Sequence, residues 1–192
     1  MINHIQQQID ASIKVKQSLE TEKIYKSVNI LADTLSQGNK ILLCGNGGSA
    51  ADCQHIAAEL VVRFRSSVKR KALPAIALTC DTSILTAGGN DIGFENIFVQ
   101  QIEALGNSGD ALIAISTSGN SENVLRAANR AKEKGIKVIG LLGGDGGKIK
   151  EKCDLPIVVS SKETARIQEA HLLIEHILCD LIERIMFPDL FD

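Results

Sequence analysis

A cluster of hydroxyl-bearing residues lies near the middle of the sequence, directly after a short apolar run. Residues 111–115 are too few for a helix and are typical of a buried strand, and residues 116–121 then read Ser-Thr-Ser-Gly-Asn-Ser. Apolar residues recur at helical spacing from Val124 as far as Gly135. A turn between a strand and a helix presents free backbone N–H groups at the positive end of the helix dipole, which favours an anion.

The composition of this turn separates two interpretations. A helix N-cap needs only one suitable residue, and Ser121 or Asn120 could supply it within an ordinary turn. However, five of the six positions are Ser, Thr or Asn, and the turn contains no lysine. We therefore interpret residues 116–121 as a neutral cradle for a phosphate monoester.

A second turn of the same kind follows the strand predicted for residues 40–44. It reads Gly-Asn-Gly-Gly-Ser at positions 45–49, and its glycines allow a ligand to approach the main chain. Ser49 stands where an N-cap or a phosphate donor would stand. The turn is not the dinucleotide-binding fingerprint G-x-G-x-x-G, because Ala50 follows Ser49.

Two predicted helices carry side chains that suit acid–base or metal chemistry. His55 and Glu59 lie four residues apart on a helix predicted for residues 49–65, so they share one face and form either a metal-ligand pair or an ordinary surface pair. The last helix, residues 163–186, is apolar on nearly every side and should be buried, where polar groups are costly without partners. Its polar side chains therefore indicate a site: Gln168, His171, Glu175 and His176.

The spacing of Gln168 and His176 restricts how one metal ion could bind both. Eight residues of regular helix correspond to a rise of roughly 12 Å and a rotation of roughly 80°, whereas a zinc–ligand bond is about 2 Å long. Either the helix is distorted near Gln168, or the two ligands reach a given site from different chains. The apolar surround of this helix favours the second interpretation, an active site completed across a subunit interface.

The remaining pattern predicts the fold. Apolar strands at residues 40–44, 73–78, 111–115, 136–142 and 155–159 alternate with helices. This is typical of an α/β three-layer sandwich, with a five-stranded, mostly parallel sheet flanked by helices. Ligands of such sheets bind beyond the carboxyl ends of the strands, where both turns fall. A loop is expected at residues 88–94, in which Asn90 and Asp91 could bind sugar hydroxyls or satisfy a turn.

Length and composition limit the class of protein. The 192 residues suffice for a single domain, 1–192, in which helices of segment 1–38 pack on partner subunits through a narrow apolar stripe. A net charge of −2 does not favour binding to nucleic acid or to an anionic membrane. The five cysteines are scattered, without a C-x-x-C pair, and we find neither an apolar signal core nor a membrane span. We expect a soluble cytoplasmic protein.

Five motifs together resemble one family. They are Cys-Gly-Asn-Gly-Gly-Ser at 44–49, His55-x-x-x-Glu59, Gly-Asn-Asp-x-Gly-Phe at 89–94, the hydroxyl turn 116–121, and Arg-Ile-Gln-Glu-x-His at 166–171 followed by His176. Over essentially its whole length the chain resembles the phosphoheptose isomerases (sedoheptulose 7-phosphate isomerases) of the sugar isomerase (SIS) domain superfamily. The hydroxyl turn alone indicates only the superfamily, whereas the combination of motifs is much more specific.

The resemblance implies an isomerase that converts D-sedoheptulose 7-phosphate to D-glycero-D-manno-heptose 7-phosphate, for ADP- or GDP-activated heptoses of lipopolysaccharide or capsule. It also implies a homotetramer with one zinc ion per subunit near the interfaces. By matching positions, the phosphate is held by Ser116, Thr117, Ser118 and Ser121. The substrate is lined by Asn46, Gly47, Gly48, Ser49, Glu59, Asn90, Asp91 and Gln168. The metal ligands are His55, Glu59, Gln168 and His176.

The chemistry of the reaction suits these residues. Ketose-to-aldose conversion moves a proton between C1 and C2 through an enediol, and needs a base together with an acid or a metal ion. Glu59 and His176 are the candidates for base and acid, and both also match metal ligands. The alternative hypothesis is a non-catalytic tetrameric SIS-domain protein that associates with the replication initiator. A third hypothesis is a sugar-phosphate sensor without catalysis. The complete set of His55, Glu59, Gln168 and His176 favours the enzyme.

Overall fold

The computed structural model of the chain, which describes residues 1–191, is an alternation of strands and helices. The strands are β1 (Ile41–Cys44), β2 (Ala75–Ala77), β3 (Ala111–Ser116), β4 (Lys137–Gly143) and β5 (Leu155–Val159). The helices are α1 (Ile2–Gln17), α2 (Thr21–Ser36), α3 (Gly48–Val61), α4 (Thr82–Asp91), α5 (Ile97–Leu105), α6 (Glu122–Glu133) and α7 (Thr164–Met186). Short 3₁₀ helices cover Phe94–Asn96, Lys150–Lys152 and Pro188–Leu190.

The five strands form one parallel sheet in the order β2-β1-β3-β4-β5. Strands β1 and β3 are buried at every position, because helices cover both faces of the sheet. This explains why both strands read as continuous apolar runs rather than alternating ones. The predicted five-stranded parallel sheet is confirmed.

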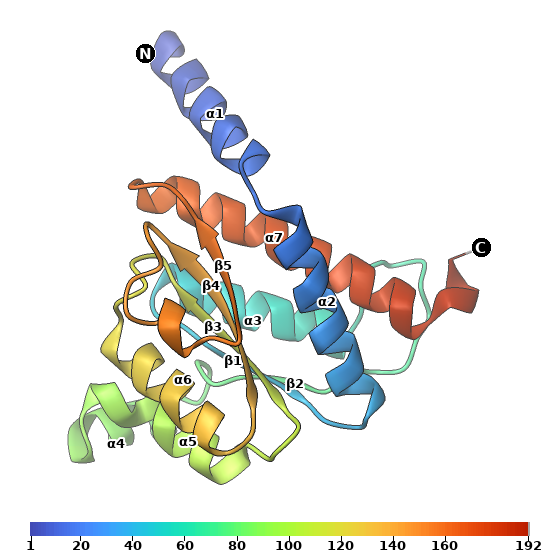
Figure 1. Cartoon of the computed structure of the whole chain (residues 1–192), viewed down its shortest axis with the longest axis vertical. Helices are drawn as coiled ribbons and strands as arrows, with labels where there is room; N and C mark the ends of the chain where they lie inside the picture. Colours follow the sequence, from blue (N-terminus) through green and yellow to red (C-terminus); the bar gives the residue numbers. More distant parts are fainter. Residues whose placement is uncertain (192) are drawn as a thin grey trace.

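Successive strand residues point to opposite faces of the sheet and build two cores. Ile113 and Ile115 of β3 pack with side chains from α2, α3 and α7. Leu112 and Ala114 pack on the other side with side chains from α5 and α6. Figure 1 shows the resulting three layers, with α4, α5 and α6 on one side of the sheet and α2, α3 and α7 on the other. The expected three-layer sandwich is therefore confirmed.

Helix α1 projects from this body, and each of its residues is at least partly exposed (Figure 1). Its link to α7 includes Arg166, whose guanidinium donates to the backbone and side-chain oxygens of Gln8. The apolar stripe predicted for this helix is exposed at Ile2, Ile5, Ile9 and Ile13. In the part of the chain that the structure describes, no helix is both long and apolar enough to cross a membrane.

Two expected helix boundaries were wrong. Residues 88–91, expected in a loop, form the last turn of α4, which is capped at its start by Asp81 accepting from the Ile84 amide. Two glycines inside a capped helix are costly but tolerated. Helix α3 ends at Val61 rather than residue 65, because the backbone beyond it is bound to α7, as described below.

Candidate active site

The strand order places a crevice between the carboxyl ends of β1 and β3. These two strands are neighbours although the chain visits β2 between them, and such a switch point is where ligands bind in open parallel sheets. Asn46, after β1, and Asn123, in α6, exchange two side-chain amide hydrogen bonds of 2.8 Å each. Beside this pair lies a hollow of about 420 Å³, lined by Asn46, Phe94, Glu95, Ser121, Glu122, Asn123 and Arg126.

The hydroxyls of the turn after β3 converge. Ser116 Oγ lies 3.0 Å from Ser121 Oγ and 3.5 Å from Ser118 Oγ, and Thr117 beside them is half-buried. Ser121 occupies the N-cap position of α6, but its hydroxyl pairs with Ser116 rather than with the helix N–H groups. The capping interpretation therefore does not account for this side chain, and an anion cradle at the start of α6 suits it better.

The turn after β1 also places its residues closely. Gly47 holds the N-cap position of α3 with a φ of 57°, a conformation that favours glycine. A Cβ added at Gly48 would collide with the side-chain amide of Gln168. Ser49 is not the N-cap that its position suggested, since it lies buried within the first turn of α3. The absence of a Cβ at Gly48 thus allows α7 to approach the start of α3.

Helices α3 and α7 lie side by side and run in the same direction. Gly48 faces Gln168, and about two turns later in both helices His55 Nε2 lies 2.9 Å from His176 Nε2. Glu59 Oε1 is 3.8 Å from the same His55 nitrogen. His55, Glu59 and His176 therefore come together within one chain. The two histidines thus meet without a partner subunit, whereas the expectation that Gln168 and His176 reach one site from different chains stays a prediction.

The same geometry bears on the expected metal ligands. Two Nε2 atoms at 2.9 Å fit a hydrogen bond in which one ring donates its N–H to the other. Imidazole and carboxylate are also ligands that zinc accepts. Gln168 lies at the Gly48 end of α3, as its eight-residue separation from His176 requires. Among residues 1–191, no three His, Cys, Asp or Glu side chains are grouped as ligands of one metal ion, so the geometric support for a metal site is the His55–His176 pair alone.

Asn90 and Asp91 precede Phe94 and Glu95 of the hollow in the chain but do not line it. They form the C-terminal end of α4, they are exposed, and the Asn90 amide donates to the Asp91 carboxylate at 2.7 Å. Within one chain they remain outside the hollow beside Asn46. A role in substrate binding stays a prediction for both residues.

Behind the two histidines, α7 buries further ionisable groups. Burial, together with the smaller effect of the nearby Asp52 carboxylate, raises the pKa of Glu175 to about 8. Burial also raises the pKa of Asp52, against the opposing effect of His55. In the described chain, both carboxylate oxygens of Glu175 are without a hydrogen-bond partner. Burial lowers the pKa of His171 to about 4.

The buried His171 should make the protein sensitive to acid. Its unfolded-state pKa is about 6.5 and its folded-state pKa about 4, so between these values the unfolded chain binds a proton that the folded chain does not. Stability is therefore lost as the pH falls, by roughly 2–3 kcal/mol between pH 7 and pH 4.5. We expect His171→Gln to lack this component when urea unfolding is measured at both pH values and one protein concentration. Parallel losses in wild type and variant would contradict this assignment.

Comparisons with known proteins agree with this geometry. The sequence matches the SIS domain family over residues 5–143. It is 53% identical to the phosphoheptose isomerase of Clostridium acetobutylicum, with all of both chains covered. It is 56% identical to that of Geotalea daltonii, over 98% of this chain and 99% of the relative. This chain belongs to the phosphoheptose isomerase family.

Solved structures of phosphoheptose isomerases share the fold. The enzyme from Neisseria gonorrhoeae superposes with a TM-score of 0.86 at 44% identity, covering 95% of this chain and 96% of the other. The enzyme from Francisella tularensis gives a TM-score of 0.87 at 40% identity, covering 95% of each chain. The phosphoheptose isomerase fold is thus the fold of this chain.

Three residues around the site were not predicted from the sequence. Asn123 ties the two turns together, and its position just after the hydroxyl turn was the only available signal. Glu183 is a buried carboxylate on the apolar last helix, so the argument that selected Gln168 and His176 would have selected it too. Its partner Arg70 lies in a segment without a periodic pattern, and nothing in the sequence indicated it.

Proposed function

We propose that this protein is an aldose–ketose isomerase that converts D-sedoheptulose 7-phosphate to D-glycero-D-manno-heptose 7-phosphate, for the synthesis of activated heptoses. The observation that carries the proposal is the pairing of His55 with His176, beside Glu59, on helices that begin next to the hydroxyl cradle. From Gly48 at the turn to His55, α3 rises roughly 10 Å. This separation suits an extended sugar whose phosphate and reacting carbons lie at opposite ends.

The side chains of the chain itself supply most of the mechanism. Hydroxyls of residues 116–121 and backbone N–H groups at the start of α6 bind the phosphate and fix the substrate by one end. Glu59 removes the proton from C1 or C2, and His176 transfers a proton to or from the carbonyl oxygen as the enediol forms and collapses. His55, in contact with His176, orients that imidazole.

We include one zinc ion per subunit in the proposal, with His55, Glu59, Gln168 and His176 as ligands. The donor types and the convergence of two imidazole nitrogens support it. When bound, zinc would polarise the substrate carbonyl. The amide of Gln168 is the weakest donor of this set, and it also lies nearest to the Gly48 turn.

A homotetramer in the cytoplasm completes the proposal. The exposed isoleucines of α1 support association with partner subunits, because a projecting helix with an apolar stripe is stabilised by covering that stripe. Sedimentation velocity should give the mass of four chains, and a monomer would contradict this part. The replication-initiator partner is not favoured, because curated relatives more than 50% identical over nearly the whole chain are named as isomerases.

The direct test is an assay with purified protein. Incubation with sedoheptulose 7-phosphate should give an aldose heptose 7-phosphate, detected by chromatography and mass spectrometry. The same protein should leave unphosphorylated sedoheptulose unchanged, because the cradle would have nothing to bind. A protein that binds sedoheptulose 7-phosphate without forming aldose would instead be a sensor, and the proposed function would be wrong.

Substitutions in the hydroxyl turn should weaken substrate binding. Ser121→Ala removes a hydroxyl held against Ser116, and Ser118→Ala removes its neighbour. Loss of a hydrogen bond to a charged group costs roughly 1.5–3 kcal/mol, so KM should rise about 10- to 150-fold in each variant. Inorganic phosphate should weaken as an inhibitor by a similar factor. If both variants bind substrate and phosphate like wild type, the phosphate site lies elsewhere.

A further inference from the structure

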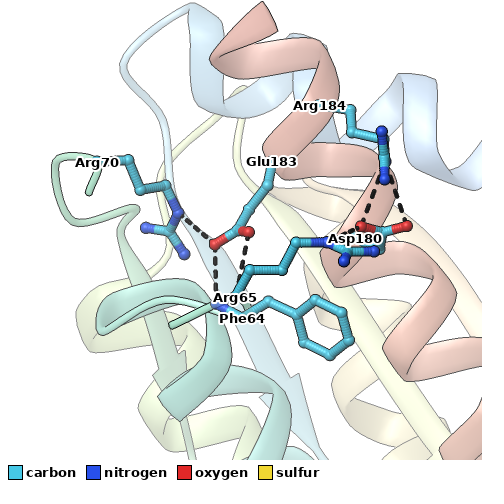
Figure 2. Close-up of polar contacts among 6 residues, drawn as sticks. All are labelled: Phe64, Arg65, Arg70, Asp180, Glu183 and Arg184. Carbon is cyan, nitrogen blue, oxygen red and sulfur yellow. Dashed lines mark hydrogen bonds and ion pairs between the residues drawn. The ribbon is translucent and has the colours of Figure 1, made fainter. Parts of the chain in front are cut away.

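A buried ion pair joins the end of α3 to the last turns of α7 (Figure 2). Arg70 Nε lies 2.6 Å from Glu183 Oε1, and both side chains are completely buried. We call these two residues, with the backbone groups that they bind, the Arg70–Glu183 clamp. Near it, Arg65 and Asp180 form a second pair at 2.7 Å that is partly exposed.

The clamp binds the backbone where α3 ends. Glu183 accepts the N–H of Phe64 at 2.8 Å and that of Arg65 at 3.4 Å. The two terminal nitrogens of Arg70 donate to the carbonyl of Leu60 at 2.9 Å and to that of Glu59 at 2.8 Å. The last carbonyls of a helix have no partner within the helix, so Arg70 replaces the missing hydrogen bonds with contacts that also reach α7.

Each clamp contact lies next to a residue of the proposed active site. Arg70 binds the backbone of Glu59 itself. Phe64, whose amide is held by Glu183, places its ring 5.6 Å from the ring of His176. Glu183 follows His176 by seven residues, about two turns of α7. The clamp therefore contacts both sides of the gap between Glu59 and His176.

From this geometry we infer that Arg70 and Glu183 are positioning residues, which set the separation of α3 and α7 at Glu59 and His176. The inference rests on the proposed isomerase function. A buried ion pair is weak evidence for stability, because desolvation offsets most of the attraction. The rigid placement of catalytic groups, in contrast, strongly affects the reaction rate, since displacements of about 1 Å can lower the rate by a hundredfold.

Arg70→Lys is the most informative substitution. Lysine keeps the positive charge beside Glu183, so the buried carboxylate stays compensated, but it lacks the planar fork that reaches the carbonyls of Glu59 and Leu60. We expect kcat to fall about 10- to 100-fold, with KM within about twofold of wild type. KM should be nearly unchanged because the phosphate cradle is formed by the turn after β3, which the clamp does not touch.

Asp180→Asn is the matched control. It removes the charge from the Arg65–Asp180 pair, which joins the same two segments, and from the pair of Asp180 with Arg184. Both pairs are partly exposed and should contribute little. Its kcat should stay within twofold of wild type. If Asp180→Asn lowers kcat as much as Arg70→Lys, or if Arg70→Lys keeps wild-type kcat, the positioning role is wrong.

A double variant separates positioning from folding. Arg70→Met with Glu183→Gln removes both buried charges together, which proteins tolerate better than removal of one, while Gln retains an acceptor for the Phe64 amide. We expect a folded protein with lowered kcat and unchanged KM. A folded double variant with normal kcat would overturn the inference. If neither Arg70→Lys nor the double variant folds, the inference is also overturned, because the clamp would then be required for folding alone.

A spectroscopic measurement tests the inference without turnover. The chain has four histidines, so selective ¹⁵N-histidine labelling gives few resonances, which single His→Gln variants assign. In Arg70→Lys the ring signals of His55 and His176 should shift, while those of His4 and His171 stay in place. Four unchanged histidines would overturn the positioning role. If the wild-type protein is inactive, the proposed function is wrong, but the histidine signals still show whether the clamp positions His55 and His176.

Discussion

Glu59→Gln should leave the protein folded and lower kcat by about a hundredfold or more, the usual effect of removing a general base. Glutamine keeps the size and hydrogen-bonding capacity of the side chain but cannot accept a proton from carbon. The Glu59 side chain is 23% exposed and its carboxylate lies 3.8 Å from His55 Nε2, so its replacement should change the packing of α3 little. The measurement is kcat with sedoheptulose 7-phosphate, accompanied by thermal unfolding.

A surface glutamate provides the matched control. Glu133→Gln makes the same chemical change on α6, where Glu133 pairs with Arg130 at the protein surface. Its kcat should equal that of wild type, because exposed pairs contribute little and it is remote from α3. Glu59→Gln with near-normal kcat in a folded protein would show that another group is the base.

Hybrid oligomers of His55→Ala and His176→Ala chains should remain inactive. The two rings contact each other within one chain at 2.9 Å, so no chain of such a hybrid holds the intact pair. Each variant alone should lose activity by a factor similar to that of other acid–base residues, about a hundredfold or more. The measurement is activity after the two chains are unfolded and refolded together, with hybrids identified by mass spectrometry.

Hybrids of wild-type and His176→Ala chains serve as the control for this experiment. They should retain activity in proportion to their wild-type chains, which shows that refolding restores working sites. Recovery of activity when the two variants are mixed would mean that the histidines act across an interface. In that case the contact between His55 and His176 of one chain would not be the catalytic one.

The local pattern of the sequence was sufficient to predict the sheet and its two turns. Residues 111–115 are continuously apolar because β3 is buried on both faces, and this constraint acts on each residue separately. The hydroxyl cluster at residues 116–121 could also be predicted as a binding site, because ligands of parallel sheets bind beyond the carboxyl ends of the strands. The sequence also predicted that His55 and Glu59 lie together, because residues four apart on a helix share one face.

Helix ends were less predictable, because they depend on distant partners. The apolar pattern extends α3 to residue 65, but the helix stops at Val61, where Arg70 takes its last carbonyls and Glu183 takes the amides that follow. Residues 88–91 read as a glycine loop, yet they complete α4. In both places tertiary contacts or a cap outweighed local propensity.

The sequence by itself determined which residues are chemically suited to the site, and the tertiary structure decided which of them meet. Spacing along α7 showed that Gln168 and His176 point to different places, and it suggested a second subunit. It carried no information on the direction in which α3 runs beside α7. Since the two helices run the same way, Gln168 meets Gly48, His176 meets His55 and Glu183 meets Phe64. Packing of two segments more than a hundred residues apart, rather than any local pattern, therefore brings the proposed acid and base together.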